Sequence, residues 1–168
     1  MATADARLDA DRSPGVGVAR SVGPAFLLAG GGTGGHISPG LAIAERIRSL
    51  DATARPIFAC SRRPIDAEML READAEFVPV PAEPFSLKPK RLIRCMLEGW
   101  RGQRVADALL REASVRHVVA LGGFVTAPVV AAAARRGVPI LLVNLDATPG
   151  KANRWVAKRA TRVLSAVP

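Results

Sequence analysis

The sequence predicts a doubly wound α/β domain, in which helices cover both faces of a parallel β-sheet. From residue 24 onward, short apolar runs alternate with segments of helical periodicity, the pattern of consecutive strand–helix units. Apolar residues make up 49% and charged residues 23% of the chain, which suits a packed core in a soluble protein. With 168 residues, the chain is of ordinary size for one domain.

The first strand is expected at residues 24–30, because a continuous apolar run there ends in glycines. Ser38 suits the N-cap of the following helix and Pro39 suits its first position, so we expect that helix at residues 38–50. The remaining elements are expected as a strand at 55–60, a helix at 64–72, a strand at 76–80, a long basic helix at 89–113, a strand at 117–121, a helix at 126–136, a strand at 138–143, a helix at 150–160 and a last strand at 161–167.

The ends of the chain and its most apolar stretch also allow predictions. Residues 1–22 lack the apolar region of a secretory signal, so we expect a disordered tail before a domain at residues 23–168. The stretch at residues 118–134 is broken by glycine and proline and is short for a membrane span. We therefore expect no transmembrane helix.

The charge balance is strongly basic, with 24 Lys and Arg against 15 Asp and Glu. Such a surface favours nucleic acid, anionic lipid or phosphorylated substrates. Nucleic acid is not expected, because aromatic residues, which stack on bases, make up only 4% of the chain. Cys60 and Cys95 have neither metal-ligand nor disulfide-framework spacing, so we expect reduced thiols in a cytosolic protein and no metal site.

Sheets of this class bind ligands beyond the carboxyl ends of their strands, and a glycine-rich run follows the first strand at residues 30–36. Its glycines let a backbone approach an anion closely, and the helix start adds free N–H groups. We predict a phosphate or diphosphate site here; the alternatives are a dinucleotide-binding turn or a structural turn. His36, which ends the run, suits a general base, a phosphate partner or a structural role.

Two further loops follow predicted strands. Gly122 and Gly123 permit a sharp turn, and Thr126 can cap the next helix and offer a hydroxyl group. Paired with the first loop, this segment would form the second wall of one cleft. In the third loop, Asp146 is either a base or a turn residue. His117, at the start of an apolar strand, is expected to be structural.

Taken together, the segments GGGTGGHISPGLAIAERI, ALGGFVTAPVVAAA and PGKANR resemble motifs of the MurG family in order and spacing, and SRRPIDAEML resembles the family's loop after the second strand. The similarity covers residues 26–168. That family transfers N-acetylglucosamine from UDP-GlcNAc to the muramyl-pentapeptide diphosphate lipid called lipid I, and its enzymes combine two Rossmann-like domains in the GT-B arrangement. The resemblance implies that this chain is the N-terminal, acceptor-binding half, without an organic cofactor, and that a donor-binding half acts in trans or was lost by truncation.

The resemblance also implies roles for individual residues. His36 is the candidate catalytic base of an inverting transfer, and Asp146 is a secondary candidate. The residues implied to bind the acceptor diphosphate are Gly31, Gly32, Thr33, Gly34, Gly35, Gly122, Gly123, Thr126, Asn153 and Arg154. One segment departs from the family: Val143-Asn144-Leu145-Asp146 stands where His-Glu-Gln-Asn is usual, so the polar set is rearranged, or acceptor choice or activity has changed.

Residues 85–116 carry eight cations against three acids, and apolar residues recur among them at helical spacing. Such a helix either lies on an anionic bilayer or packs on the core with a solvated basic face. The residues predicted to meet the membrane are Lys88, Lys90, Arg91, Leu92, Ile93, Arg94, Leu97 and Trp100. A lipid-linked substrate favours the first interpretation, which places the protein in the cytoplasm, peripherally on the inner face of the plasma membrane.

Two functions from different classes remain open. The first is the acceptor half of a hexosyltransferase, which we expect to be inactive alone. The second is a non-catalytic module that binds a diphosphate lipid or nucleotide. An NAD-dependent enzyme is not favoured, because Asp51, the acid nearest the required spacing after the glycines, follows a helix instead of ending the second strand.

Overall fold

Six parallel strands form a single sheet in the order β3-β2-β1-β4-β5-β6. The computed structural model describes residues 23–32, 34–146 and 150–166. The strands are β1 (Ala25–Ala29), β2 (Arg55–Cys60), β3 (Glu76–Pro79), β4 (Val115–Ala120), β5 (Ile140–Asn144) and β6 (Arg162–Ser165). The helices are α1 (Gly34–Leu50), α2 (Pro64–Glu72), α3 (Pro89–Glu112), α4 (Thr126–Arg136) and α5 (Lys151–Ala157). The predicted α/β class and element order are confirmed; the tail predicted at residues 1–22 lies outside the described residues.

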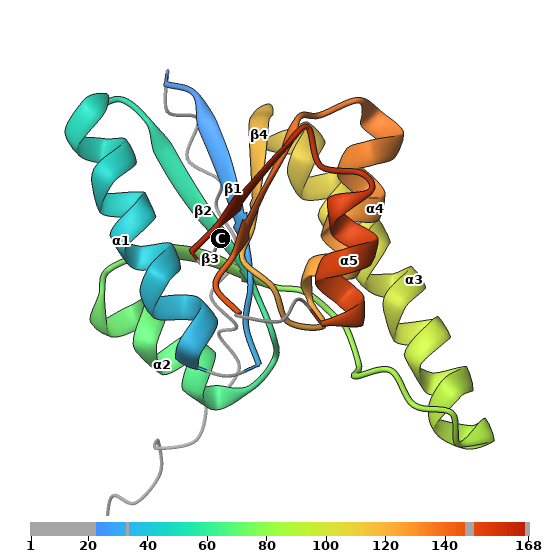
Figure 1. Cartoon of the computed structure of the whole chain (residues 1–168). Coiled ribbons are helices and arrows are strands. Elements are labelled where there is room, and N and C mark those ends of the chain that lie inside the picture. The colour runs from blue at the N-terminus through green and yellow to red at the C-terminus, as the bar shows by residue number, and fades with distance from the viewer. Residues whose placement is uncertain (1–22, 33, 147–149, 167–168) are drawn as a thin grey trace, which may run out of the picture.

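Helices cover both faces of this sheet (Figure 1). Successive residues of a strand point to opposite faces, so the two central leucines of β1 enter different cores. Leu27 packs in the larger core, to which α3, α4 and α5 contribute, and Leu28 packs in the smaller core with α1 and α2. Both leucines are fully buried. The almost uninterrupted apolar strands are thus explained by burial on both sides.

The strand order reverses between β1 and β4, which are adjacent in the sheet although two strand–helix units separate them in the chain. The connections leaving β1 and β4 therefore run to opposite faces, toward α1 and α4 (Figure 1). In open sheets a crevice forms at this switch point, beyond the carboxyl ends of the strands. The first and second glycine loops both lie there.

The predicted start of the first helix is wrong. α1 begins at Gly34, so Ser38 is not its N-cap and Pro39 lies inside the helix instead of at its first position. Helical angles are open to glycine as to other residues, at a cost of roughly 0.5–1 kcal/mol relative to alanine, so Gly34 and Gly35 can form the first turn ahead of Ser38. As a result, the N–H groups of Gly34 and Gly35 stand at the start of the helix.

The other boundaries differ by a few residues at most, which is usual for element ends. β4 begins at Val115, which is buried and pairs with Ala25, so His117 is its third residue and does not open the strand. The last strand is confirmed at the edge of the sheet, but all four of its side chains are exposed, including Val163 and Leu164 at 49% and 54%.

Among the described residues, each helix falls short of the length or apolar character needed to cross a membrane.

Candidate functional site

Three loops beyond the carboxyl ends of β1, β4 and β5 meet around Gly122. A Cβ atom at this position would lie 2.9 Å from His36 Nε2 and 3.5 Å from Asn153 Oδ1. The structure therefore brings together one predicted residue from each loop, packed so closely that a side chain on Gly122 would overlap the imidazole of His36. The backbone at Gly122 has a φ of 106°, a conformation that other residues rarely adopt.

The glycine turn after β1 is held by Asp66, a residue that the sequence interpretation missed. Asp66 is completely buried in the first turn of α2. Its Oδ2 accepts hydrogen bonds from the Gly32 N–H (2.8 Å), the Ser61 N–H (3.1 Å) and the Ser61 hydroxyl (2.6 Å). One carboxylate oxygen thus fixes both the first glycine turn and the loop that leaves β2. In the sequence, Asp66 is visible only as an acidic residue in the motif after the second strand. Its partner Gly32 lies 34 residues away, so the sequence does not reveal the bond between them.

The first and second loops pack so closely that their glycines cannot carry side chains. A Cβ atom on Gly31 would overlap the Asp66 carboxylate, and one on Gly32 would overlap the Phe124 ring. A Cβ atom on Gly123 would overlap the carbonyl oxygen of Gly31. This side of the turn is therefore filled by the protein's own atoms.

Two backbone donors of the turn are already used. The Gly30 N–H donates to the carbonyl oxygen of Ala59, and the Gly32 N–H donates to Asp66. The first N–H groups of α1 belong to Gly34 and Gly35, and at the start of a helix such groups lie before the first intrahelical acceptor. An anion at this edge would accordingly meet the start of α1. Thr33 lies outside the described residues.

Thr126 connects the first and second loops but does not cap α4 as predicted. It is the first residue of that helix and is buried, and its hydroxyl lies within donating distance of the Gly122 carbonyl (2.6 Å) and the Ala29 carbonyl (3.1 Å). The two carbonyls follow β1 and β4, and α4 has no side-chain cap among the described residues. Thr126 thereby links the end of β1 to the loop after β4.

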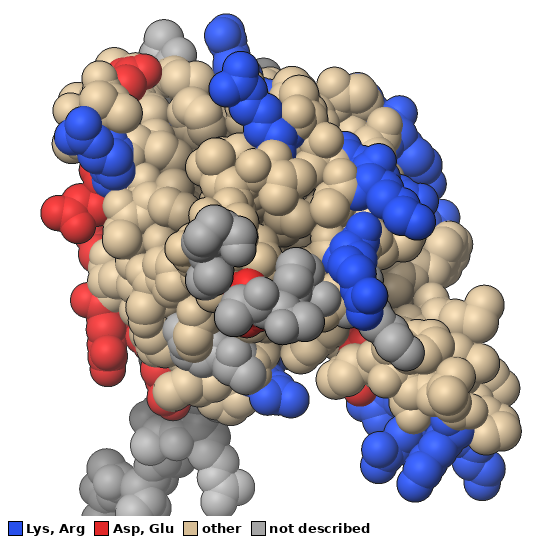
Figure 2. Space-filling model, in the orientation of Figure 1, with Lys and Arg blue, Asp and Glu red and all other residues tan. Residues whose placement is uncertain are grey.

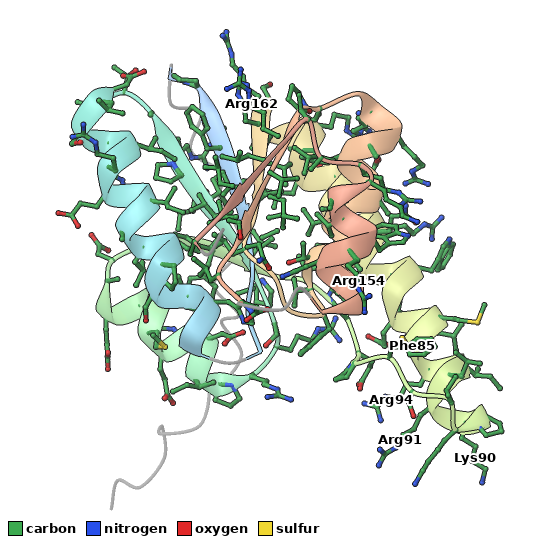
Figure 3. All side chains as sticks on the ribbon, viewed as in Figure 1. Phe85, Lys90, Arg91, Arg94, Arg154 and Arg162 are labelled. Carbon is green, nitrogen blue, oxygen red and sulfur yellow. The ribbon has the colours of Figure 1, made fainter. Side chains whose placement is uncertain are left out.

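The segment that departs from the family forms a buried pair of amides. Asn144 Oδ1 accepts a hydrogen bond from Asn153 Nδ2 (2.9 Å), and Asn144 Nδ2 donates to the Asp146 carbonyl (2.8 Å). The exposed Asp146 places its carboxylate 3.5 Å from Asn153 Nδ2. These bonds orient Asn153, so that its Oδ1 is the atom directed at Gly122. Arg154, the next residue of α5, is exposed (Figure 3).

Both cysteines are free thiols, and they lie in different surroundings. Cys60 is buried in the core between the sheet and the first two helices, and this burial, with a smaller contribution from the charge of Asp66, raises the pKa of its thiol to about 12. Cys60 is therefore a neutral, unreactive part of the core at physiological pH. Cys95, on α3, is partly exposed.

The two halves of α3 have different environments. The C-terminal half packs on the larger core through Ala106, Leu109 and Leu110. The N-terminal half projects away from the sheet, with Lys90, Arg91 and other cations gathered at its free end (Figures 2 and 3). Leu92 is half-buried there. The large apolar side chains exposed on this half and on the segment before it are Phe85, Leu87, Ile93, Met96, Leu97 and Trp100. Each of the two expected alternatives thus applies to one half of α3: the C-terminal half packs on the core, and the N-terminal half exposes apolar side chains beside its cations.

Comparison with known proteins gives one consistent result. Residues 26–165 match the glycosyltransferase family 28 N-terminal domain. The chain is 35% identical over 135 residues to the UDP-N-acetylglucosamine–N-acetylmuramyl-(pentapeptide) pyrophosphoryl-undecaprenol N-acetylglucosamine transferase of Leifsonia xyli, covering 80% of this chain and 38% of the relative. It is 34% identical over 163 residues to the protein of the same name from Mycobacterium leprae, covering 92% and 40%.

Solved structures show the same fold at lower sequence identity. MurG of Acinetobacter baumannii superposes with a TM-score of 0.73 at 21% identity, over 87% of this chain and 42% of that one. UDP-GlcNAc 2-epimerase of Neisseria meningitidis superposes with a TM-score of 0.62 at 12% identity, over 84% and 39%. The chain spans about two fifths of the length of the curated relatives it matches. The family predicted from the three loops is confirmed: this chain belongs to glycosyltransferase family 28 and contains its N-terminal domain.

Proposed function

We propose that this chain is the acceptor-binding half of an inverting GT-B hexosyltransferase, which moves GlcNAc from UDP-GlcNAc to undecaprenyl-diphosphate-muramyl-pentapeptide. The observation that carries the proposal is the meeting of His36 and Asn153 across Gly122, beside the start of α1. Relatives of which this chain matches about two fifths are named for that donor and that acceptor. The donor half acts in trans or belongs to a longer polypeptide from which this part derives.

The geometry suggests a division of tasks among the site residues. The acceptor diphosphate binds at the first N–H groups of α1, where the helix dipole favours negative charge. Arg154, exposed on α5, adds a cation at this edge. Gly122 carries no side chain that would overlap the imidazole, so His36 keeps its place beside Asn153, where the muramyl sugar would bind.

His36 then acts on the acceptor hydroxyl. In an inverting transfer this oxygen attacks the anomeric carbon of GlcNAc while the bond from that carbon to UDP breaks. The hydroxyl proton passes to the imidazole of His36, and UDP leaves as a diphosphate. Stabilising the leaving diphosphate is the task of the donor half.

The decisive experiment combines this chain with the donor-binding half of a family relative. We expect no transfer of labelled GlcNAc to a short-chain lipid I analogue by this chain alone, and measurable transfer once the donor half is added. Robust turnover without the added half would contradict the division of labour. A pair that stays silent while this chain still binds a short-chain prenyl diphosphate would favour the second candidate, a non-catalytic binding module.

One observation favours that second candidate. Asn144 stands where the family usually has a carboxylate, and the structure uses it to bond Asn153 and the loop backbone. Restoring the family residue with Asn144→Glu in the combined enzyme separates the two interpretations. A large gain in transfer would indicate that this chain has lost catalytic capacity, and a loss would indicate that the rearranged amides belong to a working site.

We also propose that the protein is cytoplasmic and binds the inner face of the plasma membrane through the projecting half of α3. This end combines exposed apolar side chains, such as Leu97 and Trp100 at 52% and 55%, with several cations. Apolar groups at an interface and cations near anionic head groups stabilise such binding together. A lipid-linked acceptor would be reached from the same surface.

Reversing two charges at this end should release the protein from anionic vesicles. For Lys90→Glu/Arg91→Glu, we expect the partition constant onto phosphatidylglycerol vesicles to fall roughly thirty-fold or more, because each cation near an anionic surface contributes about 1 kcal/mol. Sedimentation with vesicles measures this. The control Arg46→Glu/Arg48→Glu makes the same charge change on α1, on the other face of the sheet, and should bind nearly as wild type. Equal losses in both variants would indicate attraction by net charge alone.

A further inference from the structure

A second pocket lies beside the glycine turn, and the roles assigned above to the three loops do not use it. It has a volume of about 300 Å³ and opens between the loop after β2, the segment after β3 and the projecting half of α3. Its walls include three arginines and two glutamates, together with the ring of Phe124. Figure 3 shows one of these arginines, Arg94, at the free end of α3.

The pocket shares a wall with the glycine turn. Arg63 Nη1 donates a hydrogen bond to the Gly32 carbonyl (2.5 Å), and its guanidinium carbon lies 5.7 Å from the centroid of the Phe124 ring. The same ring covers Gly32 so closely that a side chain there would overlap it. A ligand with its diphosphate at the start of α1 would therefore have this pocket on the far side of Phe124 and Gly32.

The charges in the pocket leave one cation for a ligand. Arg62 pairs with Glu98 (3.6 Å) and Arg94 pairs with Glu83 (2.9 Å), and Glu98 is also bound by Arg101 (2.6 Å). Arg63 has no carboxylate partner among the described residues. Its guanidinium is fixed by a backbone carbonyl and by an aromatic face, and its remaining N–H groups suit a carboxylate, which arginine binds in bidentate fashion.

The mixed charge of the walls distinguishes between possible ligands. Because Glu83 and Glu98 are each paired with an arginine, the pocket walls carry one net positive charge, that of Arg63. This charge balances a ligand group with one negative charge and leaves the second charge of a phosphate unbalanced. A peptide ends in a single carboxylate. In a muramyl peptide this end is free, because the sugar's own carboxyl group is joined to the amino end of the peptide.

We propose that this pocket binds the peptide arm of the acceptor, and that Arg63 receives a peptide carboxylate. This inference rests on the proposed function, because it assigns a place to the pentapeptide of the same acceptor. It adds a specificity site on the β2–α2 side of the glycine turn. The diphosphate and the peptide would then be bound on opposite sides of one wall, made by Gly32, Phe124 and Arg63.

The test measures binding of two soluble probes by the whole chain. One is a short-chain prenyl diphosphate carrying the muramyl pentapeptide, and the other is the same prenyl diphosphate without sugar or peptide. For Arg63→Ala, we expect the affinity for the first probe to fall roughly ten- to hundred-fold, the usual range for a charge-assisted hydrogen bond. The affinity for the second probe should fall only about two- to three-fold, because Arg63 also bonds the Gly32 carbonyl of the turn. Arg71→Ala, a nearby arginine on α2 that stacks on Phe77, is the matched control and should change neither affinity.

A modified ligand separates a direct contact from an effect through the turn. Amidation of the peptide carboxylates should weaken binding to the wild type by a similar factor and should have little effect on Arg63→Ala. Equal loss of both probes in Arg63→Ala, or no effect of amidation on the wild type, would overturn the peptide assignment. A wild-type chain that binds neither probe would instead contradict the proposed function itself. Reduced retention of Arg63→Ala on anionic vesicles would assign the pocket to lipid and would equally overturn the peptide proposal.

Discussion

Replacement of Asp66 by alanine is expected to lower the free energy of unfolding by about 3 kcal/mol, because it leaves three buried donors without an acceptor. These donors are the N–H of Gly32 and the N–H and hydroxyl groups of Ser61, all bound to a single carboxylate oxygen. Urea denaturation followed by circular dichroism measures the change. Because Gly32 belongs to the glycine turn, binding of a short-chain prenyl diphosphate should weaken in the same variant.

Two controls define the cause of this loss. Asp66→Asn keeps an oxygen acceptor of similar shape and should recover roughly half of the lost stability. Glu68→Ala removes an exposed acid from the same helix and should cost less than about 0.5 kcal/mol. If Asp66→Ala were as stable as Glu68→Ala, the buried carboxylate would not hold the turn.

Replacement of His36 by alanine is expected to reduce transfer by the combined enzyme by about two to four orders of magnitude, the usual contribution of a general base. Affinity for the prenyl diphosphate should change by less than about three-fold, because the proposed diphosphate contacts are backbone N–H groups. Initial rates with labelled UDP-GlcNAc, together with binding measurements on the prenyl diphosphate, test these expectations.

The second histidine of the described chain provides the matched control. His117 stacks on the Phe26 ring, with 5.8 Å between the ring centroids, and it lies in β4 away from the crevice. His117→Ala should leave the rate of transfer within about two-fold of wild type. A His36→Ala variant that lost diphosphate binding and transfer to the same degree would identify His36 as a phosphate partner and not as a base.

The elements and the three loops could be predicted because their signals are local. The apolar run ending in Gly30 and the glycine pair at Gly122 each mark a strand end within a few residues, and parallel topology then places those ends at one edge. The start of the first helix could not be predicted in this way. Capping preference favoured Ser38, whereas in the folded chain the glycines before it continue the helix toward the turn.

The supports of the site were missed because their partners are distant in sequence. Asp66 is one acid among many on helices until the fold places Gly32 and Ser61 beside it. The role of Arg63 likewise depends on the fold, which places its guanidinium over the ring of Phe124, and that ring covers Gly32. Thr126 was predicted to cap its own helix, whereas its hydroxyl lies within donating distance of carbonyls at the ends of β1 and β4. Such long-range polar contacts carry no periodic signal that a single sequence reveals.

The exposed last strand has a practical consequence for work with this polypeptide in solution. β6 borders the sheet, and Val163 and Leu164 face solvent on its two sides. Its outer backbone groups can pair with any extended segment, including the same strand of another copy, and such pairing leads to aggregation as concentration rises. A lysine at position 163 would discourage that growth by charge repulsion, and it leaves the crevice at the other strands untouched.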